Sequence, residues 1–245
     1  MRKFLIALTF LTRLPAPIPK NITAEEMGKS SALFPLVGLI LGGILVGFNW
    51  LMGHIWTSSF AINVILLVSL IGLTGGLHLD GLMDTCDGIF SGRSRERMLE
   101  IMKDSSVGAF GILGAICVLL LKLAFLNEID DAQKWKALLL APTFGRWSMS
   151  FVLVAFPYAR QEGMGSAFAD FANVKCLILA SSLLVVTFVI VLQWRVGFIM
   201  PLLVISAYVL ALSISAKLGG LTGDTYGAIC EFMEMICFAA FSVSY

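Results

Sequence analysis

Long apolar stretches separated by short polar segments dominate the pattern of residues along this chain. A helix of about 20 apolar residues is long enough to cross the roughly 30 Å hydrocarbon core of a bilayer. By this criterion the sequence predicts helices over 31–56, 60–77, 107–126, 137–156, 176–194, 197–216 and 226–245. Two glutamates, Glu231 and Glu234, interrupt the last of them, so six or seven transmembrane helices are expected. The predicted fold class is an all-α, polytopic integral membrane helical bundle.

A shorter apolar stretch, FLIALTFLTRLPAPIP, precedes these helices. No small-residue cleavage site closes it, which favours a retained helix over a signal peptide. We expect this helix to lie at the membrane interface or to insert partly, and to be ended by Pro15, Pro17 and Pro19.

Composition supports the membrane class and narrows the functions. Hydrophobic residues make up 58% of the 245 residues, and the mean hydropathy is +0.92. The predicted helices leave little chain for a separate soluble domain, so residues 1–245 are interpreted as a single domain. A net charge of +1 argues against a nucleic-acid surface. The five cysteines form no CxxC pair, so neither a disulfide framework nor a zinc site is expected.

The distribution of Lys and Arg predicts the orientation in the membrane. With the N-terminus in the cytoplasm, twelve of the 17 basic residues fall in cytoplasmic segments and three on the opposite side. This bias follows the positive-inside rule. It places residues 78–106, 157–175 and 217–225 on one cytoplasmic face, where soluble phosphorylated metabolites are found.

One polar segment, His78 to Gly111, carries an unusual concentration of charge. If it is helical, Asp80, Asp84 and Asp87 fall within about 60° of arc at the i, i+4, i+7 spacing. Like charges on one stripe repel each other, and a divalent cation bound by oxygen ligands relieves that repulsion. Glu100 and Asp104 repeat the i, i+4 spacing. The segment therefore indicates a Mg²⁺ site made of carboxylates.

The simpler alternative is a solvated cytoplasmic loop whose charges only obey membrane topology. Leu79, Leu82 and Met83 lie between the carboxylates, which indicates a helix at the membrane boundary, where unpaired charges are costly. Arginines at 93, 95 and 97 supply planar donors suited to phosphate oxygens. Together with the carboxylates they indicate a metal and diphosphate site of the kind used in phosphoryl transfer.

The sequence HLDGLMDTCDG (78–88), followed by RSRERMLEIMKDSSVGAFG (93–111), resembles the cobalamin synthase family of adenosylcobinamide-GDP ribazoletransferases. Three further segments resemble the family in the same order: FLTRLP (10–15), FPLVG (34–38) and GGLTGDTYGA (219–228). The resemblance covers nearly the whole chain. It implies that adenosylcobinamide-GDP is joined to α-ribazole, or its 5'-phosphate, with release of GMP.

The family is similar in turn to the CDP-alcohol phosphotransferases, whose pattern is DxxDGxxAR followed by GxxxDxxxD. Asp84, Asp87 and Gly88 match the opening of that pattern. The AR step is one residue longer here and ends at Arg93, and the second half survives only as Glu100 and Asp104. These departures argue against transfer of a lipid head group while leaving the metal chemistry in place.

Four further residues are candidates for the site. His78 precedes the carboxylates and is either a polar cap or a phosphate contact. Arg146 lies within an apolar helix, where it must either pair with a carboxylate or bind a substrate phosphate. Asp224 and Gly223 belong to the glycine-rich GGLTGDT turn, which lets a ligand approach the backbone. The alternative for Asp224 is an N-cap of the last helix, a position that Thr222 or Thr225 also suits.

These expectations combine into one hypothesis, an enzyme of the inner membrane of a bacterial or archaeal cell with its active site facing the cytoplasm. The roles below are assigned under the resemblance. Mg²⁺ is held by Asp80, Asp84, Asp87 and Asp104, and the base is Asp104 or Glu100, with Arg97 beside them. His78, Arg93, Arg95, Arg146, Gly223 and Asp224 contact the substrates. A lipid-directed CDP-alcohol phosphotransferase and a transporter are the alternatives, and the oligomeric state, homo-oligomers included, stays open.

Overall fold

The computed structural model describes residues 1–160 and 164–243, and the regular elements of these residues are all helical. The elements in chain order are α1 (Arg2–Leu11), α2 (Ala24–Ser30), η1 (Ser31–Leu33), α3 (Phe34–Gly53), α4 (Ser59–Thr74), α5 (Leu77–Phe90), α6 (Arg95–Ile101), α7 (Ala109–Glu128), α8 (Asp131–Ala155), α9 (Met164–Phe171), α10 (Val174–Leu192), η2 (Gln193–Arg195), α11 (Val196–Leu218) and α12 (Gly223–Val243). The predicted all-α class is confirmed.

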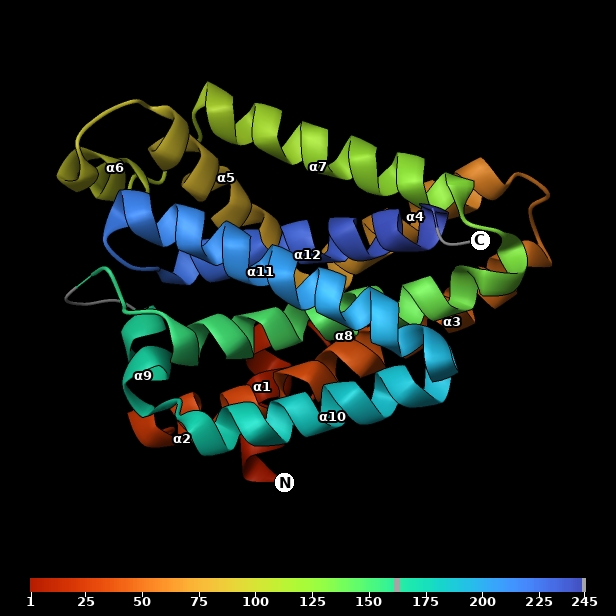
Figure 1. Cartoon of the computed structure of the whole chain (residues 1–245), viewed down its shortest axis with the longest axis horizontal. Coiled ribbons are helices and arrows are strands. Elements are labelled where there is room, and N and C mark those ends of the chain that lie inside the picture. The colour runs from red at the N-terminus through yellow and green to blue at the C-terminus, as the bar shows by residue number, and fades with distance from the viewer. Residues whose placement is uncertain (161–163, 244–245) are drawn as a thin grey trace.

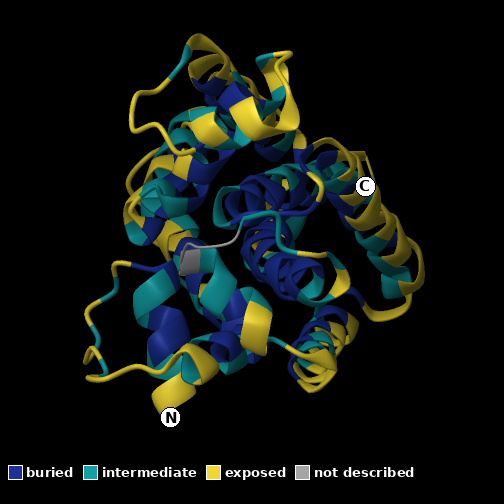
Figure 2. Cartoon of the chain, turned by 90° about the vertical axis from the view of Figure 1, so that its left-hand side faces the viewer, coloured by how far each residue is buried: buried dark blue, intermediate teal, exposed yellow. Residues whose placement is uncertain are grey.

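Helices α8 and α12 form the centre of the bundle, and the other long helices surround them (Figure 1). Figure 2 shows the bundle from one end. The central helices are dark blue, which marks buried residues, and the rim is largely exposed. Helix α3 packs closely on α8 because two of its glycines face that helix. A Cβ atom added at Gly38 would lie 2.3 Å from the Pro142 carbonyl oxygen, and one at Gly42 would lie 2.6 Å from that of Leu139.

The outer helices expose apolar side chains, as expected of surfaces that face lipid. Phe110, Leu113 and Leu120 of α7 are about half exposed or more, as are Ile190 of α10 and Phe198 at the start of α11. A water-soluble protein rarely leaves so continuous an apolar surface uncovered. This arrangement supports the prediction of a multi-pass membrane protein.

Five helical stretches of residues 1–160 and 164–243 are long and apolar enough to cross a membrane, or six if the bent pair α4 and α5 counts as one crossing. One of the five, Val174–Leu218, contains two helices, α10 and α11. They run in opposite directions in Figure 1, joined at Gln193, whose φ of 54° breaks the helix. Counted separately, they bring the number of crossings to six or seven, as the sequence predicts.

A sharp bend separates α4 from α5. Gly75 and Gly76 have φ values of 65° and 74°, a left-handed conformation that favours glycine, and the two helix axes differ by 91°. The predicted helix over 60–77 therefore ends earlier, at Thr74. Helix α5 starts inside the bundle and carries the acidic segment outward to one end (Figure 1).

Four charged side chains pair inside the bundle. The Lys122 Nζ atom of α7 lies 2.6 Å from Glu231 Oε2 and 2.6 Å from Glu234 Oε2, both on α12. Arg146 of α8 forms an ion pair with the other oxygen of Glu234. These pairs explain why the two glutamates do not interrupt α12, which continues to Val243.

The three polar segments predicted to share one face lie together at one end of the bundle, at the left of Figure 1. Arg95 Nε donates a hydrogen bond of 2.7 Å to the Leu218 carbonyl at the end of α11. Tyr158 and Leu221 form an isolated β-bridge. Arg160 Nη2 contacts the Met102 carbonyl at 3.3 Å. Segments 78–106, 157–175 and 217–225 are therefore physically connected.

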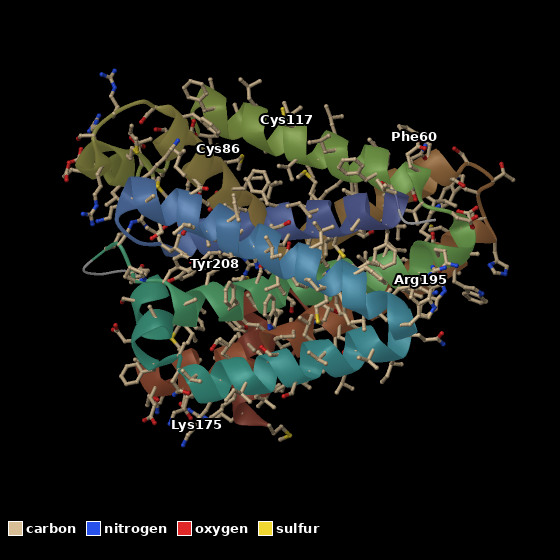
Figure 3. The ribbon with its side chains drawn as sticks, viewed as in Figure 1. Phe60, Cys86, Cys117, Lys175, Arg195 and Tyr208 are labelled. Carbon is tan, nitrogen blue, oxygen red and sulfur yellow. The ribbon has the colours of Figure 1, made fainter. Side chains whose placement is uncertain are left out.

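Two side chains labelled in Figure 3 mark the two ends of the bundle. Lys175, at the start of α10, lies at the end that carries the polar segments, whereas Arg195 lies at the other end. The charge count assigned these residues to the cytoplasmic and the opposite side, and their separation agrees with that assignment.

The N-terminal helix ends earlier than predicted. Helix α1 stops at Leu11, before the three prolines, because Thr12 is extended (φ −142°) and the Arg13 N–H donates to the Leu73 carbonyl at 2.7 Å. All five cysteines are free in the structure.

Candidate active site

The acidic residues Asp80, Asp84 and Asp87 lie on one helix, α5, as predicted. The start of α12 packs directly against this helix at two glycines. A Cβ atom at Gly81 would lie 2.6 Å from the Asp224 carbonyl oxygen, and one at Gly227 would lie 3.1 Å from the Cα atom of His78. The glycines of the two predicted motifs therefore allow the close approach that brings Asp224 beside α5.

A cavity of about 260 Å³ opens where α5, α8, α9 and α12 meet. We call it the aromatic cavity. Its lining residues are Phe10, Phe34, Leu77, His78, Asp80, Gly81, Met149, Leu153, Tyr158, Arg160, Gly165, Phe168, Gly223, Asp224, Tyr226 and Gly227. Arg160 Nη2 lies 2.8 Å from Asp224 Oδ2, so an ion pair forms part of its wall.

Asp224 is free to face this cavity because other residues cap α12. The Thr222 N–H donates to Thr225 Oγ1 at 2.8 Å, and the Thr225 N–H donates to Thr222 Oγ1 at 3.3 Å. These reciprocal bonds give hydrogen-bond partners to two backbone N–H groups at the start of the helix. The sequence left two roles open for Asp224. In the structure Asp224 lies in the wall of the cavity, whereas Thr222 and Thr225 cap the helix.

Asp84 lies one helical turn beyond Asp80, half buried in the same region. Its carboxylate is repelled by those of Asp224, Asp80 and Asp87, and it is attracted by the guanidinium of Arg160. Three carboxylates against one arginine leave an excess of negative charge. Such an excess is the environment in which a divalent cation binds.

Asp87 has a structural partner that the sequence pattern does not reveal. Its two oxygens accept hydrogen bonds from the N–H groups of Gly108 (2.7 Å) and Gly111 (2.8 Å) at the start of α7. A Cβ atom at either glycine would lie 2.4 Å from an oxygen of this carboxylate. Asp87 therefore caps α7 from a neighbouring helix. Its negative charge also interacts favourably with the partial positive charge at the N-terminus of α7.

A second hollow, of about 230 Å³, has Asp87 in its wall. It is lined by Asp87, Arg97, Glu100, Ile101, Asp104, Ser106 and Gly108. Helix α6 ends at Ile101, so Glu100 and Asp104 share this hollow without sharing a helix face, contrary to the i, i+4 interpretation. Hydrogen bonds from the Ser106 hydroxyl and N–H hold the pKa of Asp104 below its usual value, which makes it a weaker base.

The predicted Mg²⁺ ligands are thus divided between two neighbouring hollows. Asp80 faces the aromatic cavity, Asp87 and Asp104 face the second hollow, and Asp84 lies between them. Within residues 1–160 and 164–243, no three His, Cys, Asp or Glu side chains lie close enough together to hold a metal ion. The predicted ligands are nonetheless all carboxylate oxygens, which are the donors that Mg²⁺ prefers. The Mg²⁺ site stays a prediction.

The remaining predicted residues take different positions. Arg93 is exposed, Arg97 forms an exposed ion pair with Glu100 at 2.7 Å, and Arg95 holds the end of α11. Arg146 is fully buried and paired with Glu234, which is the first of the two alternatives left open for it. Gly223 lines the aromatic cavity beside Asp224.

Comparison with known proteins places the chain in a family. Residues 3–242 match the family model described as cobalamin-5-phosphate synthase. The chain belongs to this family. It is 45% identical to the adenosylcobinamide-GDP ribazoletransferase of Desulfitobacterium hafniense (96% of this chain and 94% of the relative) and 41% identical to that of Clostridium acetobutylicum (95% and 92%). No solved structure matches the chain.

For this member of the cobalamin-5-phosphate synthase family, the sequence reasoning missed Arg160, Tyr158 and Tyr226. In the sequence, Arg160 is only one of the basic residues of the predicted cytoplasmic segment 157–175, yet in the structure it pairs with Asp224 and lines the aromatic cavity. Its position depends on the bridge between Tyr158 and Leu221, reinforced by the Ala159 N–H, which donates to the Leu221 carbonyl at 2.7 Å. The only available signal was YGA in the last motif, which contains Tyr226.

Proposed function

We propose that the protein is an adenosylcobinamide-GDP ribazoletransferase, which joins adenosylcobinamide-GDP to α-ribazole or its 5'-phosphate and releases GMP. The match to the family over nearly the whole chain and the names of the relatives support this activity. The structural observation that carries it is the group of carboxylates around Asp84, which meets Arg160 beside a cavity.

The reaction needs one bond to form and one to break. A free ribose hydroxyl of the ribazole, and not the 5' oxygen that carries the phosphate in the 5'-phosphate, attacks the phosphorus that bears the corrinoid's side arm. The bond from that phosphorus to the bridging oxygen breaks, and GMP leaves with the bridging oxygen. The attacking hydroxyl loses its proton to a base, whereas GMP carries the displaced negative charge. No covalent intermediate with the protein is required.

We assign the Mg²⁺ ligands to Asp80, Asp84, Asp87 and Asp104, following the chemistry of these side chains. A bound Mg²⁺ supplies positive charge that polarises the diphosphate and stabilises the GMP that leaves. Asp84 would contribute most, because the carboxylates of Asp224, Asp80 and Asp87 all repel its own. Asp87 would still be able to hold the ion, because each carboxylate oxygen has two lone pairs and only one of them accepts a hydrogen bond from α7.

Arginines bind the phosphate groups in this proposal. Arg93 and Arg97 are exposed at the same end as the carboxylates, and Arg160 lies at the cavity wall. Guanidinium groups form paired hydrogen bonds with phosphate oxygens, so these side chains orient the diphosphate. Arg95 is committed to the Leu218 carbonyl and serves to hold the polar segments together.

The base that accepts the proton remains Asp104 or Glu100 in our proposal. Both are exposed and line the second hollow next to Asp87. The lowered pKa of Asp104 favours Glu100 for this role, because a base is most effective when its pKa is near the working pH.

We place the protein in the inner membrane of a bacterial or archaeal cell with the site facing the cytoplasm. The twelve-to-three distribution of basic residues and the gathering of the polar segments at one end support this orientation. The apolar outer faces of α7, α10 and α11 are suited to contact with lipid.

The test is an assay of GMP release by the full-length protein in nanodiscs, with adenosylcobinamide-GDP and α-ribazole as substrates and CDP-linked donors as competitors. We expect Asp84→Asn to lower the rate roughly 100-fold or more, since removing one electrostatic group from a preorganised site costs factors of about 10²–10³. Glu128→Gln, at an exposed carboxylate at the far end of α7, is the matched control. Normal turnover by Asp84→Asn, or turnover of CDP-linked donors only, would contradict the proposal.

A further inference from the structure

The aromatic cavity has two chemically different ends. One end is apolar, with Phe168 between the rings of Phe10 (4.7 Å between centroids) and Phe34 (5.7 Å). Met149 and Leu153 of α8 complete this end. The other end is polar and carries Asp80, Arg160 and Asp224, and Arg160 and Asp224 form an ion pair. His78 also lines the cavity, and the charged groups that act on its ring are Arg146, Glu234 and Lys122. A ligand that fills the cavity must therefore be apolar and flat at one end and polar at the other.

Several buried polar atoms around this cavity have no hydrogen-bond partner among the described residues. They are both ring nitrogens of His78, the hydroxyl of Tyr226 and the Nε atom of Arg160. The side chains of His78 and Tyr226 are 1% and 3% exposed, so bulk solvent does not reach them freely. Buried polar groups in folded proteins are almost always paired, and all three residues line this one cavity. These atoms indicate that the cavity is built for a ligand that carries hydrogen-bonding groups.

The size of the cavity restricts that ligand. A cavity of about 150 Å³ with apolar walls is large enough to bind benzene. The aromatic cavity, at about 260 Å³, has room for a fused two-ring system at its apolar end but not for a corrinoid macrocycle. The ligand is therefore a small aromatic group attached to a polar one.

We propose that the aromatic cavity binds the acceptor nucleoside, with a two-ring base that lacks N–H groups among Phe10, Phe34 and Phe168 and with its sugar at Asp80 and Asp224. This inference rests on the proposed function, because the acceptor named there, ribazole, is a ribosyl benzimidazole. A guanine base fits less well, since its amide edge would lie against side chains that offer no hydrogen bonds.

The position of the polar end is consistent with catalysis. Asp80 lines the cavity and lies one helical turn, about 6 Å along α5, from Asp84. A sugar bound at Asp80 and Asp224 therefore presents its hydroxyl groups next to the carboxylates that we assign to Mg²⁺. The donor diphosphate then occupies the second hollow, beside Arg97.

The experiment measures binding of α-ribazole, and separately of GMP, to the full-length protein in nanodiscs without the other substrate. Phe168→Ala should weaken α-ribazole binding roughly tenfold or more, as expected for loss of a ring that stacks on a base. Phe168→Leu keeps the apolar volume and should weaken it severalfold. The affinity for GMP should stay unchanged in both variants.

Phe188→Leu is the matched control. Phe188 is fully buried and packs on Phe144 at 6.1 Å, but it does not line the cavity. This variant should bind α-ribazole like the wild type at a comparable cost in stability. In turnover assays, Phe168→Leu should raise KM for α-ribazole and leave KM for the donor unchanged.

Three results would separate the possible failures. Unchanged α-ribazole affinity in both Phe168 variants would overturn the inference. Weaker binding of GMP, with α-ribazole unaffected, would assign the cavity to the donor's base instead. If the wild type releases no GMP from adenosylcobinamide-GDP but binds α-ribazole in a Phe168-dependent way, the proposed function fails while the binding site stands.

Discussion

Replacing Lys122 with methionine should destabilise the protein far more than removal of an exposed lysine. Methionine keeps the unbranched side chain but removes the charge that contacts Glu231 and Glu234 at 2.6 Å each. Glu234 retains Arg146 as a partner. Glu231, by contrast, forms its ion pair with Lys122. The Glu231 side chain is only 11% exposed, so it would lose this partner while still buried.

The expected magnitude follows from this loss of pairing. Removing one partner of a buried ion pair costs about 3–5 kcal/mol, because the remaining charge stays buried without compensation. For a chain of this length, that corresponds to a fall in Tm of roughly 6–20 °C. The exposed pair of Lys29 and Glu25 is the control, and Lys29→Met should change the stability little, because solvent screens this pair.

Thermal unfolding of the purified protein in one detergent measures the difference. The double variant Lys122→Met/Glu231→Gln removes one charge of each sign and should melt closer to the wild type than Lys122→Met does. If Lys122→Met melts within about 2 °C of Lys29→Met, or if the double variant is the less stable of the two, the buried pairs do not hold α7 to α12.

Three further predictions test the site and the topology. Asp224→Asn should reduce GMP release at least tenfold at an unchanged level of folded protein, because an uncharged amide cannot form the ion pair with Arg160. Turnover equal to that of the wild type would show that this aspartate is dispensable. Gly111→Ala should lower Tm, since its Cβ would lie 2.4 Å from the carboxylate that caps α7, whereas Gly47→Ala, which meets no atom of the described residues within 4 Å, should not. In a cysteine-free background, a cysteine at Arg95 should be protected from an impermeant thiol reagent in intact cells and one at Arg195 should be labelled, and the reverse pattern would invert the topology.

The long helices could be predicted from the sequence because hydropathy alone selects them. Each apolar stretch must satisfy its backbone hydrogen bonds within the bilayer, and a helix does so without partners. The bend between α4 and α5 was missed because two adjacent glycines inside an apolar stretch are also compatible with a continuous helix. The bend is decided by packing of α5 against α12, which the local sequence does not encode.

The site was predicted in part, and the reason is similar. The carboxylates of α5 could be found because they contrast with an apolar chain and follow helical spacing. The aromatic cavity could not be found, since its walls come from α1, α3, α5, α8, α9 and α12, and each phenylalanine alone resembles any other core residue. Arg160 gained its partner only through a bridge between segments about 60 residues apart.

The charged residues inside the apolar helices indicate which helices pack together. Glu231 and Glu234 interrupt the last predicted helix, and Arg146 has two alternative roles in the sequence. Lys122 lies within the predicted helix over 107–126. These four residues comprise two charges of each sign, which is the balance that a low-dielectric interior requires. Considered together, they predict that α7 and α8 pack on α12, and the structure has those contacts. The same pairing weakens the transporter alternative, because side chains that neutralise one another in a closed cluster do not provide an open polar path across the membrane.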